Sequence, residues 1–212
     1  MKNQLFKYFF SLVSLLFLIN LAACASMDKS ECTAANWEII GLEDGSKGRK
    51  SNYIGHHRKA CVKHHIAPNL TQYLKGHKVG VQQFCTAENG YQQGKQGSKN
   101  NGVCPPNIFK EFNRGFNQGS HIYAIQTNIN QVENNLNQLN QQLQQIENDI
   151  HLKEEEIINT NGQYQRREIL AQIKDLQRNS KSIQFKINNL EIELYRQEET
   201  YQGLINTPYQ KY

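Results

Sequence analysis

The stretch IYAIQTNINQVENNLNQLNQQLQQIENDI, residues 122–150, decides the fold of the C-terminal half of the chain. Its apolar residues recur at alternating steps of three and four, the spacing that lays one apolar stripe along an α-helix and buries it against another helix. The series consists of Ile122, Ile125, Ile129, Val132, Leu136, Leu139, Leu143, Ile146 and Ile150, and it continues at Ile157 with Lys153 as a polar interruption. This pattern predicts a long coiled-coil helix.

A second series with the same spacing begins after residue 162. It consists of Ile169, Ile173, Leu176, Ser180, Ile183, Ile187, Leu190, Leu194, Gln197, Tyr201 and Leu204. The intervening sequence from Asn159 to Gly162 is typical of a turn or a helix C-cap. The heptad phase changes across this sequence in a way that a skip of three or four residues does not explain. We therefore predict two helices, each of about 40 residues and about 60 Å in length, with a turn near residues 159–162.

The charges favour an antiparallel hairpin over a parallel homodimer. Acidic residues precede the turn and basic residues follow it, so folding back brings opposite charges together, whereas a parallel pair would align like charges. These residues are Glu147, Asp149, Glu154, Glu155 and Glu156 before the turn, and Arg166, Arg167, Lys174 and Arg178 after it. A two-helix hairpin buries only a narrow stripe, so we expect a protein partner or self-association through the coiled coil, residues 117–204, followed by a tail at 205–212.

The N-terminus has the composition of a bacterial lipoprotein signal peptide. Lys2 and Lys7 precede an apolar run at residues 8–19, which is too short to span a membrane as a stable anchor. The sequence Leu-Ala-Ala-Cys that ends at Cys24 resembles the lipobox, in which the cysteine is acylated after cleavage. An ordinary secretory signal with an incidental cysteine is the alternative. We expect a signal peptide at residues 1–23 and a lipidated N-terminus with a short linker at residues 24–30.

The acyl chains on Cys24 would anchor the protein firmly, since one chain alone binds a membrane only marginally. Ala25 follows the acylated position. By resemblance to known sorting rules, a residue other than Asp there favours the outer membrane. We therefore expect the periplasmic face of the outer membrane as the location, with the inner membrane as the less favoured site.

Four further cysteines, Cys32, Cys61, Cys85 and Cys104, indicate two disulfides in an exported domain. Three pairings are possible for four cysteines. We favour Cys32–Cys61 and Cys85–Cys104, because each closes a local loop of about 20 to 30 residues. Each link would stabilise the fold by about 3 kcal/mol. This matters because the domain that we expect at residues 31–116 contains few Leu and Val residues.

Glycines with aromatic neighbours recur throughout this cysteine-rich domain. A spacing of four residues, as in Gly41 and Gly45 or Gly76 and Gly80, places glycines on one face of a helix, where two backbones can approach closely. The alternative is that the glycines mark turns. Gly90 begins a stretch that repeats the spacing of the first group, which suggests an internal repeat with irregular distances between its units. The predicted fold class is all-α, a small disulfide-stapled helical domain followed by a long antiparallel coiled-coil hairpin.

A set of glycines, cysteines and aromatic residues in the chain resembles the pattern of a known family. The landmarks are Cys32, Trp37, Gly41, Asp44, Gly45, Gly48, His57, Cys61, Tyr73, Gly76, Gly80, Phe84, Cys85, Gly90, Gly94, Gly97, Val103, Cys104 and Pro105. With them, residues 30–120 resemble an uncharacterised lipoprotein family of Gram-negative bacteria, catalogued as a domain of unknown function. Val81 stands where the family usually has Leu. The family has no assigned activity, so the resemblance implies boundaries and location and no mechanism.

The strongest candidate for metal chemistry is the group of histidines around Cys61. His57 and His65 lie four residues on either side of that cysteine and would share a helix face with it, flanked by His56 and His64. Imidazole and thiolate bind zinc or copper. A disulfide at Cys61 would remove its thiolate, and surface histidines are the more common case. Metal or small-ligand binding through these four histidines is therefore the alternative function.

Other chemistries find little support in the sequence. There is no nucleophile elbow, phosphate loop or dinucleotide fingerprint, and Asp44 before Gly45 is the residue type of a turn or cap. The net charge is +5, and loss of Lys2 and Lys7 leaves 5 − 2 = +3 on dispersed residues, which argues against nucleic-acid binding. We expect no enzyme activity and no cofactor. The expected function is an envelope interaction or scaffold protein that acts through its coiled coil.

Overall fold

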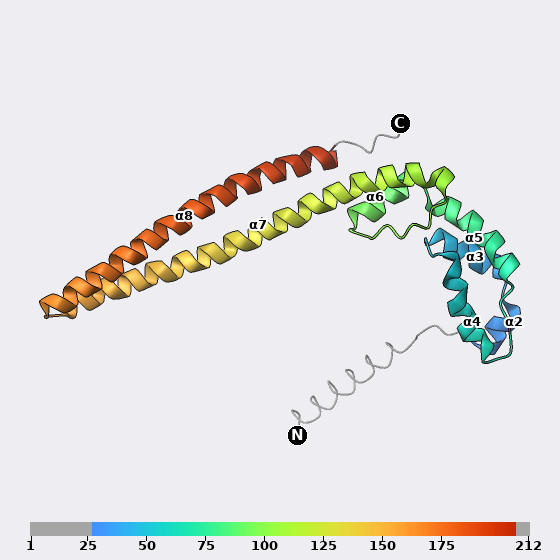
Figure 1. Cartoon of the computed structure of the whole chain (residues 1–212), viewed down its shortest axis with the longest axis horizontal. Helices are drawn as coiled ribbons and strands as arrows, with labels where there is room; N and C mark the ends of the chain where they lie inside the picture. Colours follow the sequence, from blue (N-terminus) through green and yellow to red (C-terminus); the bar gives the residue numbers. More distant parts are fainter. Residues whose placement is uncertain (1–26, 207–212) are drawn as a thin grey trace, which may run out of the picture. The chain divides into compact units, whose positions relative to one another are not determined.

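The computed structural model describes residues 27–206, and this part of the chain is helical without a strand (Figure 1). The elements are α2 (Lys29–Ala34), α3 (Trp37–Ser46), the 3-10 turn η2 (Ser51–Tyr53), α4 (Ile54–Val62), α5 (Leu70–Phe84), α6 (Ala87–Lys95), α7 (Pro106–Asn159) and α8 (Gln163–Asn206). The predicted all-α class, with a disulfide-stapled helical part and a long hairpin, is confirmed. The chain divides into two compact units, the first holding α2 to α5 with residues 102–105 and the second holding α6 to α8.

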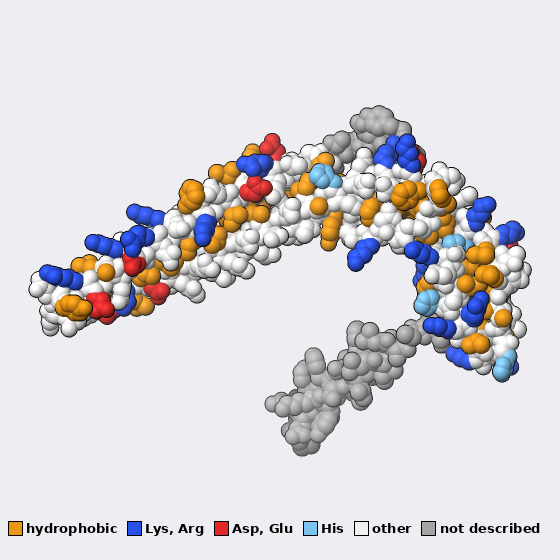
Figure 2. Space-filling model, in the orientation of Figure 1, with side chains coloured by type: hydrophobic (Ala, Val, Ile, Leu, Met, Phe, Trp, Pro, Cys, Tyr) orange, Lys and Arg blue, Asp and Glu red, His pale blue; other side chains and the backbone are white. Residues whose placement is uncertain are grey.

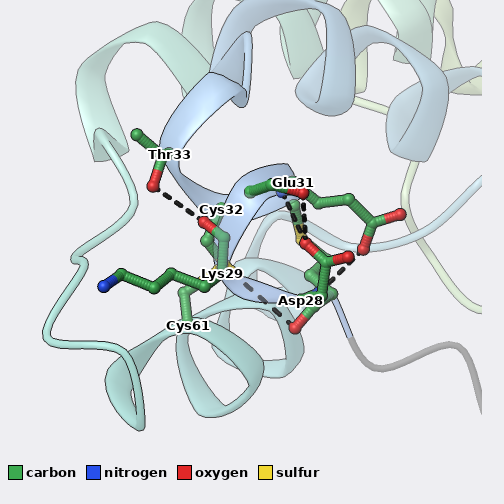
Figure 3. Close-up of a disulfide and its surroundings, with 8 residues drawn as sticks. Asp28, Lys29, Glu31, Cys32, Thr33 and Cys61 are labelled. Carbon is green, nitrogen blue, oxygen red and sulfur yellow. Dashed lines mark hydrogen bonds between the residues drawn. A yellow bond between two sulfur atoms is a disulfide. The ribbon is translucent and has the colours of Figure 1, made fainter.

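The first described helix of the first unit, α2, is capped at its N-terminus and held to α4 by a disulfide. The Asp28 carboxylate accepts a hydrogen bond from the backbone N–H of Glu31, and the Glu31 carboxylate accepts one from the backbone N–H of Asp28, which is a capping box (Figure 3). Cys32 on this helix forms a disulfide with Cys61 on α4. Both cysteines are buried and pack with Trp37, Ile54 and Tyr73 in the core of the unit.

Glycines bring α3 and α5 into backbone contact. A Cβ added at Gly41 or Gly45 would overlap the carbonyl oxygen of Tyr73 or His77 on α5, and one at Gly76 would overlap the carbonyl of Glu38 on α3. Each overlap is closer than the 3.0 Å that real Cβ atoms respect. The prediction that these glycines let helices approach closely is therefore confirmed in this unit.

The second unit repeats this arrangement with α6 and the first turns of α7. A Cβ at Gly90 or Gly94 would overlap the carbonyl oxygen of Phe112 or Phe116, and one at Gly115 would overlap that of Ala87. The helix ends match too: Gly48 after α3 and Gly97 after α6 have φ angles of 70° and 71°, which favour glycine. A Cβ at either would strike an aromatic ring, of Phe84 and of Tyr123 respectively. The internal repeat that the spacing suggested is thus a repeat in structure.

The hairpin follows from the two apolar series. The two helices lie side by side and bury Ile122, Ile129 and Leu136 on α7 and Ile169, Ile173, Ile183 and Ile187 on α8 (Figure 1). Leu136, Ile183 and Ile187 form one core cluster, against which Leu139, Leu143, Leu190 and other seam residues pack. Residues 160–162 separate the helices, as predicted for the turn.

α7 is longer than the sequence suggested. It has 54 residues and begins at Pro106, so the boundary expected at residues 116–117 lies inside a continuous helix. The reason is that its first turns carry Gly115 and Gly119, which pack on α6, before the heptads begin at Ile122. α8 has 44 residues, close to the expected length.

The charges of the hairpin pair within each helix. Glu155 pairs with His151 and Glu156 with Lys153, while Arg178 pairs with Asp175. Among residues 27–206, the recorded ion pairs of the hairpin join residues three or four apart, the spacing at which side chains on one helix meet. The opposite charges on either side of the turn therefore do not form the inter-helix ion pairs that we expected.

No helix in residues 27–206 is both long enough and apolar enough to cross a membrane.

Candidate functional site

The most unusual feature of the first unit is a buried carboxylate, that of Asp44 on α3. Its side chain is 3% exposed. One oxygen accepts a 2.8 Å hydrogen bond from Nη1 of Arg49, and the other accepts 2.8 Å bonds from the Tyr73 hydroxyl and from Nε2 of His57. The carboxylate thus joins α3, the loop after it, α4 and α5. We refer to Asp44, Arg49, His57 and Tyr73 as the Asp44 cluster.

Local structure explains how these side chains meet. Gly41 and Gly45 flank Asp44 in the sequence and let α3 approach α5 closely, which places the Tyr73 hydroxyl within reach. The left-handed conformation of Gly48 then reverses the chain. As a result the backbone N–H of Arg49 donates to the Asp44 carbonyl at 2.9 Å, and its guanidinium returns to the Asp44 carboxylate.

The environment determines the ionisation of both buried groups. Burial is the largest single effect on the pKa of Asp44 and raises it, but the hydrogen bonds from His57, Tyr73 and Arg49 together outweigh burial and lower the pKa below 3.8. Burial raises the pKa of Tyr73 well above its ordinary value of 10.0, and the hydrogen bond to Asp44 adds to this rise. The cluster therefore holds an ionised carboxylate against a neutral phenol.

Aromatic rings enclose the cluster. The Arg49 guanidinium lies 4.2 Å from the centroid of the Tyr53 ring, a cation–π contact. His77 stacks on Tyr73 with centroids 5.8 Å apart, and its Nε2 is 2.7 Å from the Arg49 carbonyl oxygen, to which it donates. His57 meets the Trp37 ring edge to face. Of the four residues of the Asp44 cluster, Arg49 and His57 are partly exposed, at 39% and 18% of their side chains, while Asp44 and Tyr73 are buried.

The second unit provides an internal comparison for this cluster. The glycine contacts place Phe112 where the first unit has Tyr73 and Phe116 where it has His77. At the helix end, the backbone N–H of Ser98 donates to the carbonyl of Gln93, just as Arg49 donates to Asp44. Gln93 thus occupies the position of Asp44. The same glycine-packed helix pair forms there with an amide and two phenylalanines, so close packing of the helices does not require the buried charge.

The four histidines expected to bind metal have separate surroundings. His56 packs on the Tyr53 ring with centroids 4.5 Å apart, and His57 belongs to the Asp44 cluster. His64 follows the end of α4, with its Nε2 buried and unpartnered within the described residues, and His65 has a φ of 61°. In residues 27–206, no three His, Cys, Asp or Glu side chains are grouped so that they could hold a metal ion. The structure therefore does not bring these histidines together as one site.

The disulfides follow the favoured pairing. Cys32 bonds to Cys61 and Cys85 bonds to Cys104, with Cα atoms 5.7 Å and 5.6 Å apart. The thiolate of Cys61 is therefore not a metal ligand. Cys24, the expected lipidation site, lies outside the described residues together with the expected signal peptide.

Most of the Asp44 cluster was not predicted from the sequence. Asp44 was expected in a turn or cap, whereas it is a buried residue inside α3, which ends at Ser46, two residues before the left-handed Gly48. Arg49, Tyr73 and His77 were not singled out for a polar site. A comparison of the two glycine repeats position by position was the available signal, since it shows a carboxylate at residue 44 against an amide at residue 93.

Residues 36–121 match the model of a family described as "Protein of unknown function (DUF2799)". The match begins just before α3 and ends just before the first heptad residue, Ile122, so it spans both glycine-packed helix pairs and leaves out most of the hairpin. This fits the resemblance to an uncharacterised family. No curated protein and no solved structure matches the chain.

Proposed function

We infer that this protein is an exported lipoprotein, held at the periplasmic face of the outer membrane by acyl chains on Cys24, and that it acts there as an interaction or scaffold protein through its helical hairpin. The observation that carries this proposal is the hairpin. α8 has 44 residues, or about 66 Å of helix. It packs on α7 through a single seam and leaves its outer faces to solvent.

A protruding hairpin suits the presentation of a binding surface. Large apolar side chains remain exposed on it, including Phe185 at 67% and Tyr195 at 70%. The other outward positions are rich in Asn and Gln, as at residues 137–142, and this composition does not resemble that of a helix lying in a membrane interface, which carries Lys, Arg and aromatic residues at its boundary. These features support a protein partner.

Two experiments test the two parts of the proposal. Cys24→Ser should move the protein from the membrane to the soluble fraction, and mass spectrometry of the wild type should find an acylated Cys24 at the mature N-terminus. An unmodified N-terminus in the soluble fraction would contradict the anchor.

For the hairpin, crosslinking in cells should compare the full chain with a chain that ends at Gln126. That variant keeps the glycine contacts of α7 and the Tyr123 ring over Gly97. Retention of both disulfides and of helical circular dichroism provides the control for its folding. Loss of the crosslinked species supports the proposal, and an unchanged set of crosslinked proteins would refute it.

The alternative, metal or small-ligand binding through His56, His57, His64 and His65, stays a prediction. Calorimetric titration of the exported chain with zinc and copper tests it, since binding tighter than about micromolar would be required of a specific site.

A further inference from the structure

The outer side of α8 carries a short apolar stripe. Phe185, Ile192 and Tyr195 are 67%, 59% and 70% exposed. They are separated by seven and then three residues, so they lie on one side of the helix, turned away from the buried seam at Ile183 and Ile187. Single exposed apolar residues are ordinary on protein surfaces, but three large ones aligned on one helix face indicate a binding surface.

Charged residues extend this stripe in both directions. Lys181 lies one turn before Phe185 and Glu199 lies one turn after Tyr195, on the same side of α8. Both are exposed, and within residues 27–206 neither forms an ion pair in its own chain. Figure 2 shows basic side chains along the edge of the hairpin near its turn, with acidic side chains both near the turn and farther along. The stripe therefore has a positive end and a negative end.

Such a surface is complementary to itself when reversed. If Asn188 of one α8 faces Ile192 of an antiparallel copy, the same register places Phe185 against Tyr195 and Lys181 against Glu199. Two-fold symmetry makes every contact occur twice. A parallel pair would instead place Lys181 against Lys181 and Glu199 against Glu199. We propose that two copies of this chain associate antiparallel through the outer face of α8. The Phe185–Tyr195 contacts lie near the centre of this interface, and the Lys181–Glu199 contacts lie at its two ends.

The contact is small, so the dimer is weak. It uses three apolar side chains from each copy, which is less than a standard interface buries. In solution we expect association at about 10–100 µM. Anchoring on one membrane would raise the effective concentration of the copies and make this affinity sufficient. In this respect the inference rests on the proposed function, which it deepens by naming the partner.

Charge reversal tests the register directly. In sedimentation velocity of the exported Cys24→Ala chain, Lys181→Glu and Glu199→Lys should each weaken dimerisation about fivefold, since each turns two attractive pairs into two repulsive ones. The double variant should restore it, because the pairs are then exchanged. Phe185→Ser with Ile192→Ser should abolish the dimer, while Ile158→Ser, which removes an isoleucine that is 77% exposed elsewhere on the hairpin, should not.

Cysteine crosslinking gives a second readout that does not depend on affinity. Under mild oxidation, a chain with Phe185→Cys mixed with a chain with Tyr195→Cys should form a mixed disulfide dimer, whereas neither chain alone should do so. Crosslinking of the Phe185→Cys chain with itself would show a parallel pair and overturn the proposal.

A wild type that stays monomeric to about 200 µM, or a double reversal that fails to restore association, would also overturn it. Neither result touches the proposed function, which fails separately if the chain ending at Gln126 keeps every crosslinked species of the full chain.

Discussion

Asp44 and Tyr73 are 29 residues apart in the chain, and the Tyr73 hydroxyl donates a 2.8 Å hydrogen bond to the Asp44 carboxylate inside the first unit. Replacing Asp44 leaves the Tyr73 hydroxyl, the Arg49 guanidinium and the His57 ring without the acceptor that they share. We expect Asp44→Ala to lower the free energy of unfolding by about 2–3 kcal/mol, because the buried Tyr73 hydroxyl loses its acceptor. Denaturant titration followed by the fluorescence of Trp37, the single tryptophan, measures this change.

Gln93→Ala is the matched control, since Gln93 has the same place in the second glycine pair. It should cost less than about 1 kcal/mol when unfolding is followed by far-ultraviolet circular dichroism. If Asp44→Ala and Gln93→Ala lower the free energy of unfolding equally, the hydrogen bonds of the Asp44 carboxylate make no special contribution to stability.

The stability of the first unit should depend on pH through Asp44. Its pKa is lowered below 3.8 in the folded protein, so its contribution to stability is present above pH 3.8 and is lost as the pH falls through the folded pKa. We therefore expect the urea midpoint reported by Trp37 to fall as the pH is lowered through 3.8 and below it. Asp44→Asn should flatten this dependence.

Asp28→Asn should leave most of this pH dependence in place. The pKa of Asp28 is also lowered, chiefly by the backbone hydrogen bond from Glu31, but its carboxylate is fully exposed. If the urea midpoint of Asp44→Asn depends on pH as strongly as that of the wild type, other carboxylates govern acid unfolding.

The two glycine-packed pairs should tolerate no methyl group at their contacts. Gly76→Ala would drive a Cβ into the carbonyl of Glu38, and Gly115→Ala into that of Ala87. Backbone atoms cannot yield as a side-chain end can, so we expect losses of about 3 kcal/mol or more in thermal or denaturant unfolding.

Gly55 on α4 is the control for these substitutions, because nothing lies within 4 Å of a Cβ built there. Gly55→Ala should raise stability by about 0.5–1 kcal/mol, since alanine favours a helix over glycine. A loss at Gly55 comparable to that at Gly76 would mean that the loss does not come from the close approach of two helix backbones.

Each disulfide should stabilise the fold by about 3 kcal/mol. The loops span 29 and 19 residues, and because the entropic term varies only with the logarithm of loop length, the two removals should cost nearly the same. Paired Cys→Ala variants at Cys32 with Cys61 and at Cys85 with Cys104, compared in denaturant titrations, measure both. If either pair can be removed without loss, its bond is not a structural one.

The sequence was most informative where a pattern repeats. The heptads from Ile122 to Leu204 predicted the hairpin and its turn, because a seam between two helices requires apolar residues at the same positions of every heptad. The loop lengths favoured the observed disulfides, because contacts between neighbouring helices are local in the chain. Gly41 and its counterparts marked helix contacts, since only a missing side chain permits that approach.

The Asp44 cluster escaped prediction for a physical reason. Its members, from Asp44 to Tyr73, belong to three helices and a loop, so no spacing along the chain connects them. An aspartate before a glycine occurs far more often in turns than in cores, and its burial here depends on the close approach of α5. The extent of α7 was underestimated for a related reason, because its first turns follow the glycine pattern and not the heptad.

One uninterrupted helix, α7, carries both the glycine contacts with α6 and the seam of the hairpin. A force applied near residue 160 would therefore reach the carbonyl groups of Ala87 and Tyr91 without crossing a joint. Main-chain atoms locked at this distance cannot slip past Gly115 and Gly119 by a side-chain rearrangement. A force on the hairpin is therefore transmitted along α7 to its backbone contacts with α6.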